Sequence, residues 1–147
     1  MHSSKKCVIG LILLVALTSL GFAADLRVVV LDSKTGEPLH HKKACVTFRP
    51  SLPEPSSCRL TDSADTATFP VPIPSPPTVY ISLLTNDLVS CFSAHSFPSI
   101  EVMNVGLVVA NTCTAAKRSQ TPTPGTIVVF AHQMTFLEVL KSMGREL

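Results

Sequence analysis

The amino-acid sequence predicts a mainly β protein: a β-sandwich of about seven strands, a short helix in an insertion, and an amphipathic C-terminal helix. Short runs rich in β-branched residues recur at intervals of about 8–15 residues. Turns that contain Gly or Pro separate these runs, which is typical of a sandwich. The chain has 147 residues, of which 46% are hydrophobic. This length and composition support one small domain with its own core.

Residues 1–23 are typical of a secretory signal peptide. Lys5 and Lys6 precede an apolar run over residues 8–17, and small residues before Ala24 suit cleavage there. An uncleaved signal anchor is the alternative, because the uncharged stretch approaches the length of a membrane span. We expect cleavage, a secreted or periplasmic protein, and no stable membrane span in the mature chain. The two lysines account for the formal net charge of +2, so the mature domain is neutral and predicts no nucleic-acid partner.

The sandwich domain is expected over residues 24–130, and each of its strands has a local signal. A turn around Gly36 ends the first strand, and a turn over Asp62–Asp65 predicts a hairpin between the third and fourth. Five prolines within residues 70–77 predict an extended connector. The expected strands are residues 26–32, 44–49, 58–61, 66–71, 78–84, 107–110 and 126–130.

Two helices complete the expected fold. Residues 97–106 predict the short helix, because Pro suits its first turn and Gly its exit. A polar linker over residues 114–125 then precedes the last strand. Residues 131–147 predict the C-terminal helix, where Thr135 and Glu138 have the spacing of a capping box.

The C-terminal helix has one apolar face. Phe136, Val139, Leu140 and Met143 lie at i, i+3, i+4 and i+7. We expect this face to pack on the sandwich, and the alternative is that it docks a partner or a membrane surface. The helix carries few cations, which disfavours the membrane.

Four cysteines follow the signal segment. An even number in a small exported domain predicts two disulfides. Three connectivities are open, and we favour Cys45–Cys58 with Cys91–Cys113, because each pair brackets one excursion between expected strands. The intervals between the cysteines are too wide for the close ligand pairs of a zinc site.

The first expected turn resembles a known family. A strand ends at Asp32, the turn Thr35-Gly-Glu-Pro-Leu39 follows, and a strand returns with Val46-Thr-Phe48. This resembles the first hairpin of carboxypeptidase regulatory-like domains, which are Ig-like or transthyretin-like β-sandwiches, over residues 26–84. The usual glycine of the next turn is replaced around Ala64. The resemblance implies a non-catalytic accessory module.

The second half of the chain resembles a group of secreted bacterial proteins to which no activity is assigned. In that group a cysteine-bracketed segment, here residues 106–113, precedes a Val-Val-Phe strand and a C-terminal helix. This resemblance adds no expectation about a ligand.

No catalytic motif is present in the sequence. His-Glu-x-x-His, Gly-x-Ser-x-Gly and the phosphate-binding glycine loops do not occur, so we predict no catalytic, cofactor-binding or metal-binding residues. His40 and His41 predict a solvated basic loop, with an anion or metal contact as the alternative. Asp62 and Asp65 offer too few oxygens for Ca²⁺ and predict a turn. Tyr80 lies mid-strand and is expected in the core.

Three functional hypotheses follow. The first is an exported non-enzymatic module that binds a protein partner of the cell envelope. The second is a carbohydrate-binding module of the envelope, against which the absence of Trp and the single Tyr count. The third is a small secreted hydrolase with dispersed residues.

Overall fold

The computed structural model describes residues 24–49, 57–84, 86–114 and 120–144, so the expected signal peptide lies outside the described residues. This part of the chain forms nine strands and two helices. In chain order they are β1 (Asp25–Asp32), β2 (Lys43–Thr47), β3 (Ser57–Leu60), β4 (Thr66–Pro70), β5 (Thr78–Leu83), β6 (Leu88–Ser90), β7 (Ser96–Pro98), α1 (Ser99–Asn104), β8 (Leu107–Val108), β9 (Thr126–Gln133) and α2 (Phe136–Met143).

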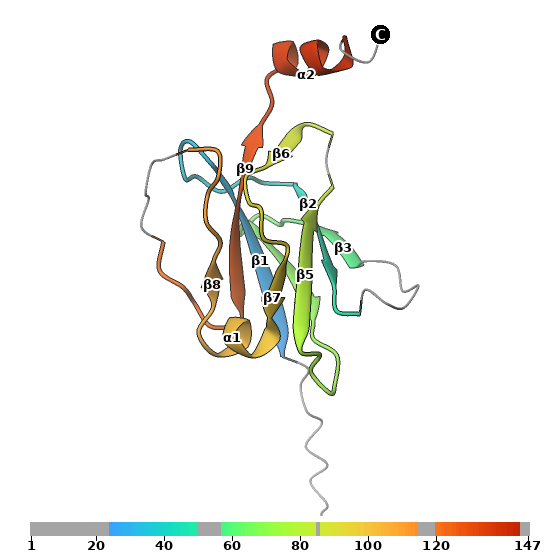
Figure 1. The fold of residues 1–147 in the computed structure, drawn as a ribbon, viewed down its shortest axis with the longest axis vertical. Helices are drawn as coiled ribbons and strands as arrows, with labels where there is room; N and C mark the ends of the chain where they lie inside the picture. The colour runs from blue at the N-terminus through green and yellow to red at the C-terminus, as the bar shows by residue number, and fades with distance from the viewer. Residues whose placement is uncertain (1–23, 50–56, 85, 115–119, 145–147) are drawn as a thin grey trace, which may run out of the picture.

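The strands form two sheets that face each other, which confirms the predicted β-sandwich (Figure 1). The first sheet has the order β4-β1-β9-β6, with β8 also paired to β9. The second sheet has the order β3-β2-β5-β7. β1 and β9 run parallel. β9 lies inside this sheet, with β1 on one side and β6 and β8 on the other.

The core lies between the inner faces of the two sheets. β1 alternates up to Val30, since Leu26, Val28 and Val30 are at most 1% exposed while the residues between them are not fully buried. Phe69 on β4 and Ile81 on β5 are the largest contributions from the neighbouring strands. Full burial of each such side chain contributes about 1.5–3 kcal/mol relative to exposure, so this cluster is the main source of stability.

The predictions of a hairpin at the Gly36 turn and of a hairpin at the Asp62–Asp65 turn are both wrong, for the same reason. β1 pairs with β4 and β9, whereas β2 pairs with β3 and β5, so the turn around Gly36 crosses from one sheet to the other. The turn over Asp62–Asp65 likewise leads from β3 in the second sheet to β4 in the first. Because each strand has one apolar face, two strands in facing sheets can bury these faces against each other, which a flat hairpin does not allow.

Two further strands were not expected. β6 falls in a segment to which the sequence assigned no element, and β7 falls where the short helix was expected to begin. Three residues are too few for a period-two pattern to be visible in a sequence. The short helix itself is confirmed as α1, and β9 continues to Gln133, beyond its expected end.

Candidate functional site

The N-terminus of α2 forms as its sequence predicts. The Thr135 hydroxyl accepts a hydrogen bond from the Glu138 N–H, and the Thr135 N–H donates to the Glu138 carboxylate at 2.7 Å. Hydrogen bonds from the backbone and side chain of Thr135, and then from His132, lower the pKa of Glu138 below its usual range. The carboxylate therefore stays ionised and satisfies a donor that the first helical turn leaves free.

The apolar face of α2 does not pack on the sandwich, which corrects the expected packing. No residue of α2 is buried, and Phe136, Leu140 and Met143 are 75%, 45% and 56% exposed. Leu137 is 67% exposed beside them, and Val139 is half-buried. Two residues, Met134 and Thr135, join β9 to α2. The helix lies beyond the end of β9, away from both sheets (Figure 1).

The contacts at the base of α2 are polar. The His132 Nε2 atom lies 3.4 Å from the Glu138 carboxylate, and the Met134 N–H donates to the Asp87 carbonyl at 2.8 Å. Asp32, at the end of β1, is a further carboxylate near His132. Burial opposes its ionisation, but hydrogen bonds from Thr35 and Lys34 outweigh this and lower the pKa of Asp32. The base of the helix is thus positioned by hydrogen bonds, and its apolar side chains are left uncovered.

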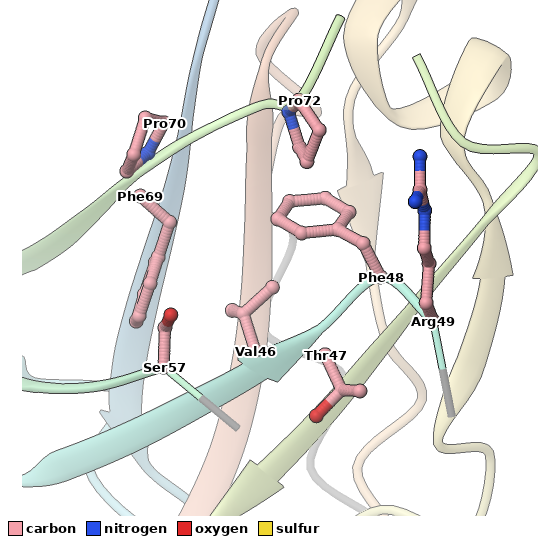
Figure 2. A pocket seen from close by; sticks show the side chains of 8 residues that line it. All are labelled: Val46, Thr47, Phe48, Arg49, Ser57, Phe69, Pro70 and Pro72. Atoms are coloured by element: carbon pink, nitrogen blue, oxygen red, sulfur yellow. The ribbon is translucent and has the colours of Figure 1, made fainter. Parts of the chain in front are cut away.

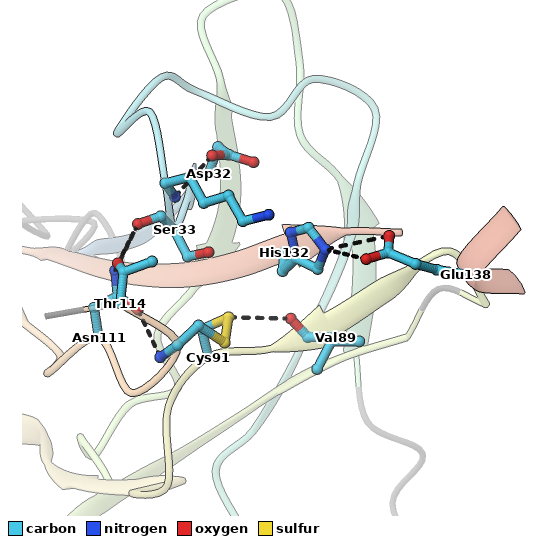
Figure 3. The surroundings of a disulfide bond; sticks show 10 residues. Asp32, Ser33, Val89, Cys91, Asn111, Thr114, His132 and Glu138 are labelled. Carbon is cyan, nitrogen blue, oxygen red and sulfur yellow. Dashed lines mark hydrogen bonds and ion pairs between the residues drawn. A yellow bond between two sulfur atoms is a disulfide. The ribbon is translucent and has the colours of Figure 1, made fainter. Parts of the chain in front are cut away.

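Both favoured disulfides are formed. Cys45 and Cys58 lie directly opposite each other on β2 and β3, and Cys91 is bonded to Cys113. The second disulfide holds the segment after β8 against the outer face of the first sheet (Figure 3). Next to it, Asn111 and Thr114 both donate to the Ser33 carbonyl, at 2.9 and 2.6 Å. Two disulfides indicate an oxidising compartment outside the cytosol.

The basic loop before β2 is only partly solvated. His40 and His41 are exposed, and His40 forms an ion pair with Asp65. Lys42, by contrast, has a side chain only 12% exposed, with its Nζ 2.9 Å from the Asp87 carboxylate. The hydrogen bond from Lys42 lowers the pKa of Asp87. This corrects the expectation of a solvated loop for Lys42, because the ion pair joins the loop to the start of β6.

Asp62 stabilises the turn in which it was expected. Asp62 accepts hydrogen bonds from the N–H groups of Ala64 and Thr66, at 2.8 and 3.1 Å. Within the residues that the structure describes, no group of three or more His, Cys, Asp or Glu side chains could hold a metal ion.

A hollow lies at the other end of the sandwich, between the end of β2 and the segment that follows β4. Figure 2 shows Phe48 at its centre, with Pro70 and Pro72 along one side and Arg49 on the other. The side chain of Phe69, which belongs to the core, lies deep in it. The cavity volume is about 250 Å³.

A second hollow, of about 440 Å³, adjoins the first, because Phe48 and Arg49 line both. Residues 74–77, Thr78 and Tyr80 form the rest of its lining. We call the two hollows together the proline-lined groove. Tyr80 was expected in the core, but it is half-buried and lines this groove, whereas Val79 and Ile81 point inward. The alternation along residues 78–83 was the signal that could have placed it.

Comparisons with known proteins add little to these observations. No family model matches the chain, and no curated protein matches it, so the resemblance to regulatory-like domains stays a prediction. Among solved structures, the chain is similar to one described as "Crystal structure of group B streptococcus pilus 2b backbone protein", with a TM-score of 0.41 and 11% sequence identity. The similarity covers 78% of this chain and 42% of that one, so the chain spans less than half of its length.

Neither helix in the described part of the chain is both long enough and apolar enough to cross a membrane.

Proposed function

We propose that the protein is an exported, non-catalytic interaction module that binds a protein partner through the apolar face of α2. The observation that carries the proposal is the exposure of Phe136, Leu137, Leu140 and Met143 on one capped helix. Water contact with such side chains is unfavourable, and each contributes about 1.5–3 kcal/mol when it becomes fully buried. A partner that buries the face would therefore gain affinity from side chains that the sandwich leaves uncovered.

The spacing of these residues supports a protein groove as the occupant. Phe136, Val139, Leu140 and Met143 lie at i, i+3, i+4 and i+7 of a short helix, which is the anchor spacing of helix-in-groove recognition. A helix that lies on an anionic membrane surface is rich in Lys and Arg, whereas α2 carries one cation, Lys141, and one anion, Glu138. The disulfides and the N-terminal pattern support a location outside the cytosol, so the proposed partner is a protein of the cell envelope or its surroundings.

Site-specific photo-crosslinking in the envelope fraction tests this proposal. A photo-reactive amino acid at Leu140 should yield a cross-linked partner, and the same amino acid at Ser142, on the polar face, should not. With the purified partner, Leu140→Asp should weaken binding at least about tenfold, while Ser142→Asp should leave it unchanged. Equal cross-linking from both positions, or an affinity that Leu140→Asp leaves intact, would overturn the proposal.

Sedimentation of the purified protein separates a heterologous partner from a second copy of the chain. We expect a monomer at micromolar concentration. A dimer that Leu140→Asp dissociates would assign the face to self-association instead and would contradict the proposed partner.

A further inference from the structure

We propose that the proline-lined groove binds a carboxylated oligosaccharide. The groove lies at the end of the sandwich opposite α2 (Figure 1), so the proposal is independent of the partner proposed for the helix. Its two hollows, of about 250 and 440 Å³, fall around the size range of small-molecule sites, about 300–1,000 Å³. Because the hollows meet at Phe48 and Arg49, a ligand longer than one sugar ring can contact both.

The charge of the groove selects an anion. Arg49 is the one charged residue among the described residues that line either hollow. It is exposed, and it forms no ion pair with any residue in the described part of the chain. A guanidinium makes two parallel hydrogen bonds to a carboxylate. Arg59, whose guanidinium carbon lies 5.8 Å from the ring centre of Phe69, adds a second cation near the first hollow.

The rings of the groove select a ligand with flat C–H faces. Phe48 and Tyr80 present aromatic rings, and the prolines between β4 and β5 present saturated ones. The face of an aromatic ring is electron-rich and attracts C–H groups, which the flat side of a pyranose supplies. Ser75 and Thr78, in the second hollow, add hydroxyl groups that both donate and accept hydrogen bonds, as sugar hydroxyls require.

The same prolines disfavour a peptide as the ligand. A peptide that adds to a sheet is held by main-chain hydrogen bonds, and proline has no N–H to donate. Pro70, Pro72, Pro74, Pro76 and Pro77 all occur in the wall of the groove. A ligand held along this wall must be recognised by ring faces and hydroxyl groups, which a saccharide offers and an extended acidic peptide does not.

Isothermal titration of the purified, disulfide-bonded protein with defined oligomers tests the proposal. The probes are a hexamer of galacturonic acid, a neutral hexamer of glucose, a hexaglutamate peptide and free galacturonic acid. We expect the uronic acid hexamer to bind at least about tenfold more tightly than each of the other three. Equal binding of the neutral hexamer, or tighter binding of the peptide, would overturn the saccharide assignment, and so would no binding of the uronic acid hexamer at millimolar concentration.

Matched variants locate the site. Arg49→Gln should weaken binding of the uronic acid hexamer at least about tenfold, because a charge-assisted hydrogen bond is lost, while Arg27→Gln on β1 should change it less than about twofold. Tyr80→Ala should weaken binding several-fold, and Tyr80→Phe, which keeps the ring, should restore most of it. An equal loss in Arg27→Gln, or none in Arg49→Gln, would contradict the site. Thermal unfolding of each variant checks the fold, and Leu140→Asp should bind the hexamer like the unaltered protein.

Discussion

β9 and α2 follow each other in the chain and are both rich in apolar side chains, yet their burial is opposite. Six consecutive residues of β9, Thr126 to Ala131, are buried, whereas no residue of α2 is. β9 needs neighbours on both edges to satisfy its backbone. The facing sheet covers one of its faces, and the segment around Cys91 covers the other. A helix satisfies its own backbone, so α2 forms without any such cover. Apolar content alone therefore did not decide which of the two segments became core.

Truncation of one apolar side chain in each segment should show the largest difference. Ile127→Ala on β9 removes a side chain that is fully buried and should lower the free energy of unfolding by about 2–5 kcal/mol. Leu137→Ala on α2 should change it by less than about 0.5 kcal/mol. Urea unfolding followed by circular dichroism measures both. Comparable losses in the two variants would mean that α2 packs on the sandwich in solution.

Removal of the disulfide over the outer face of the first sheet should have the next largest effect. Cys91 and Cys113 are 22 residues apart, and loss of a cross-link over a loop of this size costs about 3 kcal/mol in the chain-entropy model. The double variant Cys91→Ala with Cys113→Ala should therefore unfold at lower urea concentration. The helical signal of α2 in NMR spectra should persist in this variant. Disappearance of that signal below the unfolding transition would show that the helix depends on the sandwich.

Two glycines, one inside the sandwich and one at the end of α2, provide a matched comparison of these two parts of the molecule. Gly106 has φ +86°, and a β-carbon there would overlap the backbone of Thr123, so Gly106→Ala should cost about 2 kcal/mol or more. Gly144 ends α2 with φ −74°, and a β-carbon there would make only ordinary van der Waals contacts, so Gly144→Ala should change stability by less than about 0.5 kcal/mol. Thermal unfolding with a calorimeter measures both. A harmless Gly106→Ala would contradict the close approach of residues 106 and 123.

Acid should affect α2 before it affects the core, and this is the smallest expected effect. The pKa of Glu138 is lowered in the folded protein, so its contribution is present above the usual carboxyl value and is lost as pH falls through the lower folded pKa. Carbon-13 shifts of residues 136–143 should move toward coil values as the pH falls below the usual pKa range of a glutamate. Glu138→Gln should flatten this profile, and the shifts of Val129 in the core should stay constant. A profile unchanged by Glu138→Gln would rule out the capping carboxylate as the cause.

The longer strands that were predicted correctly share one property. β1, β2, β4, β5 and β9 each span five or more residues and contain at least two β-branched residues, which is enough to show in a sequence. β6 and β7 have three residues each and form because β9 and β5 offer free backbone groups beside them. Their existence depends on partners that are distant in the chain, so local patterns could not reveal them.

Some features of the candidate sites could be predicted from local sequence, and others depend on segments that are distant in the chain. The apolar face of α2 was visible in the sequence, because the spacing of its residues fixes which side of a helix they share. That the face is uncovered was not visible, since it depends on the direction in which α2 leaves the end of β9 (Figure 1). The proline-lined groove was missed altogether, because Phe48, Arg49, Pro72 and Tyr80 come from three separate segments that only the sandwich brings together.

By itself, the sequence determined the β class, both helices and the capping box, and it favoured the cysteine pairing that the structure shows. These features depend on hydrogen bonds, propensities and intervals within a few residues or one short excursion of the chain. Only the tertiary structure decided which strands share a sheet, that both expected hairpins cross between sheets, and which apolar segment is left in water. Those outcomes depend on which distant segments offer unsatisfied backbone groups and apolar faces, and this is settled only when the whole core is assembled.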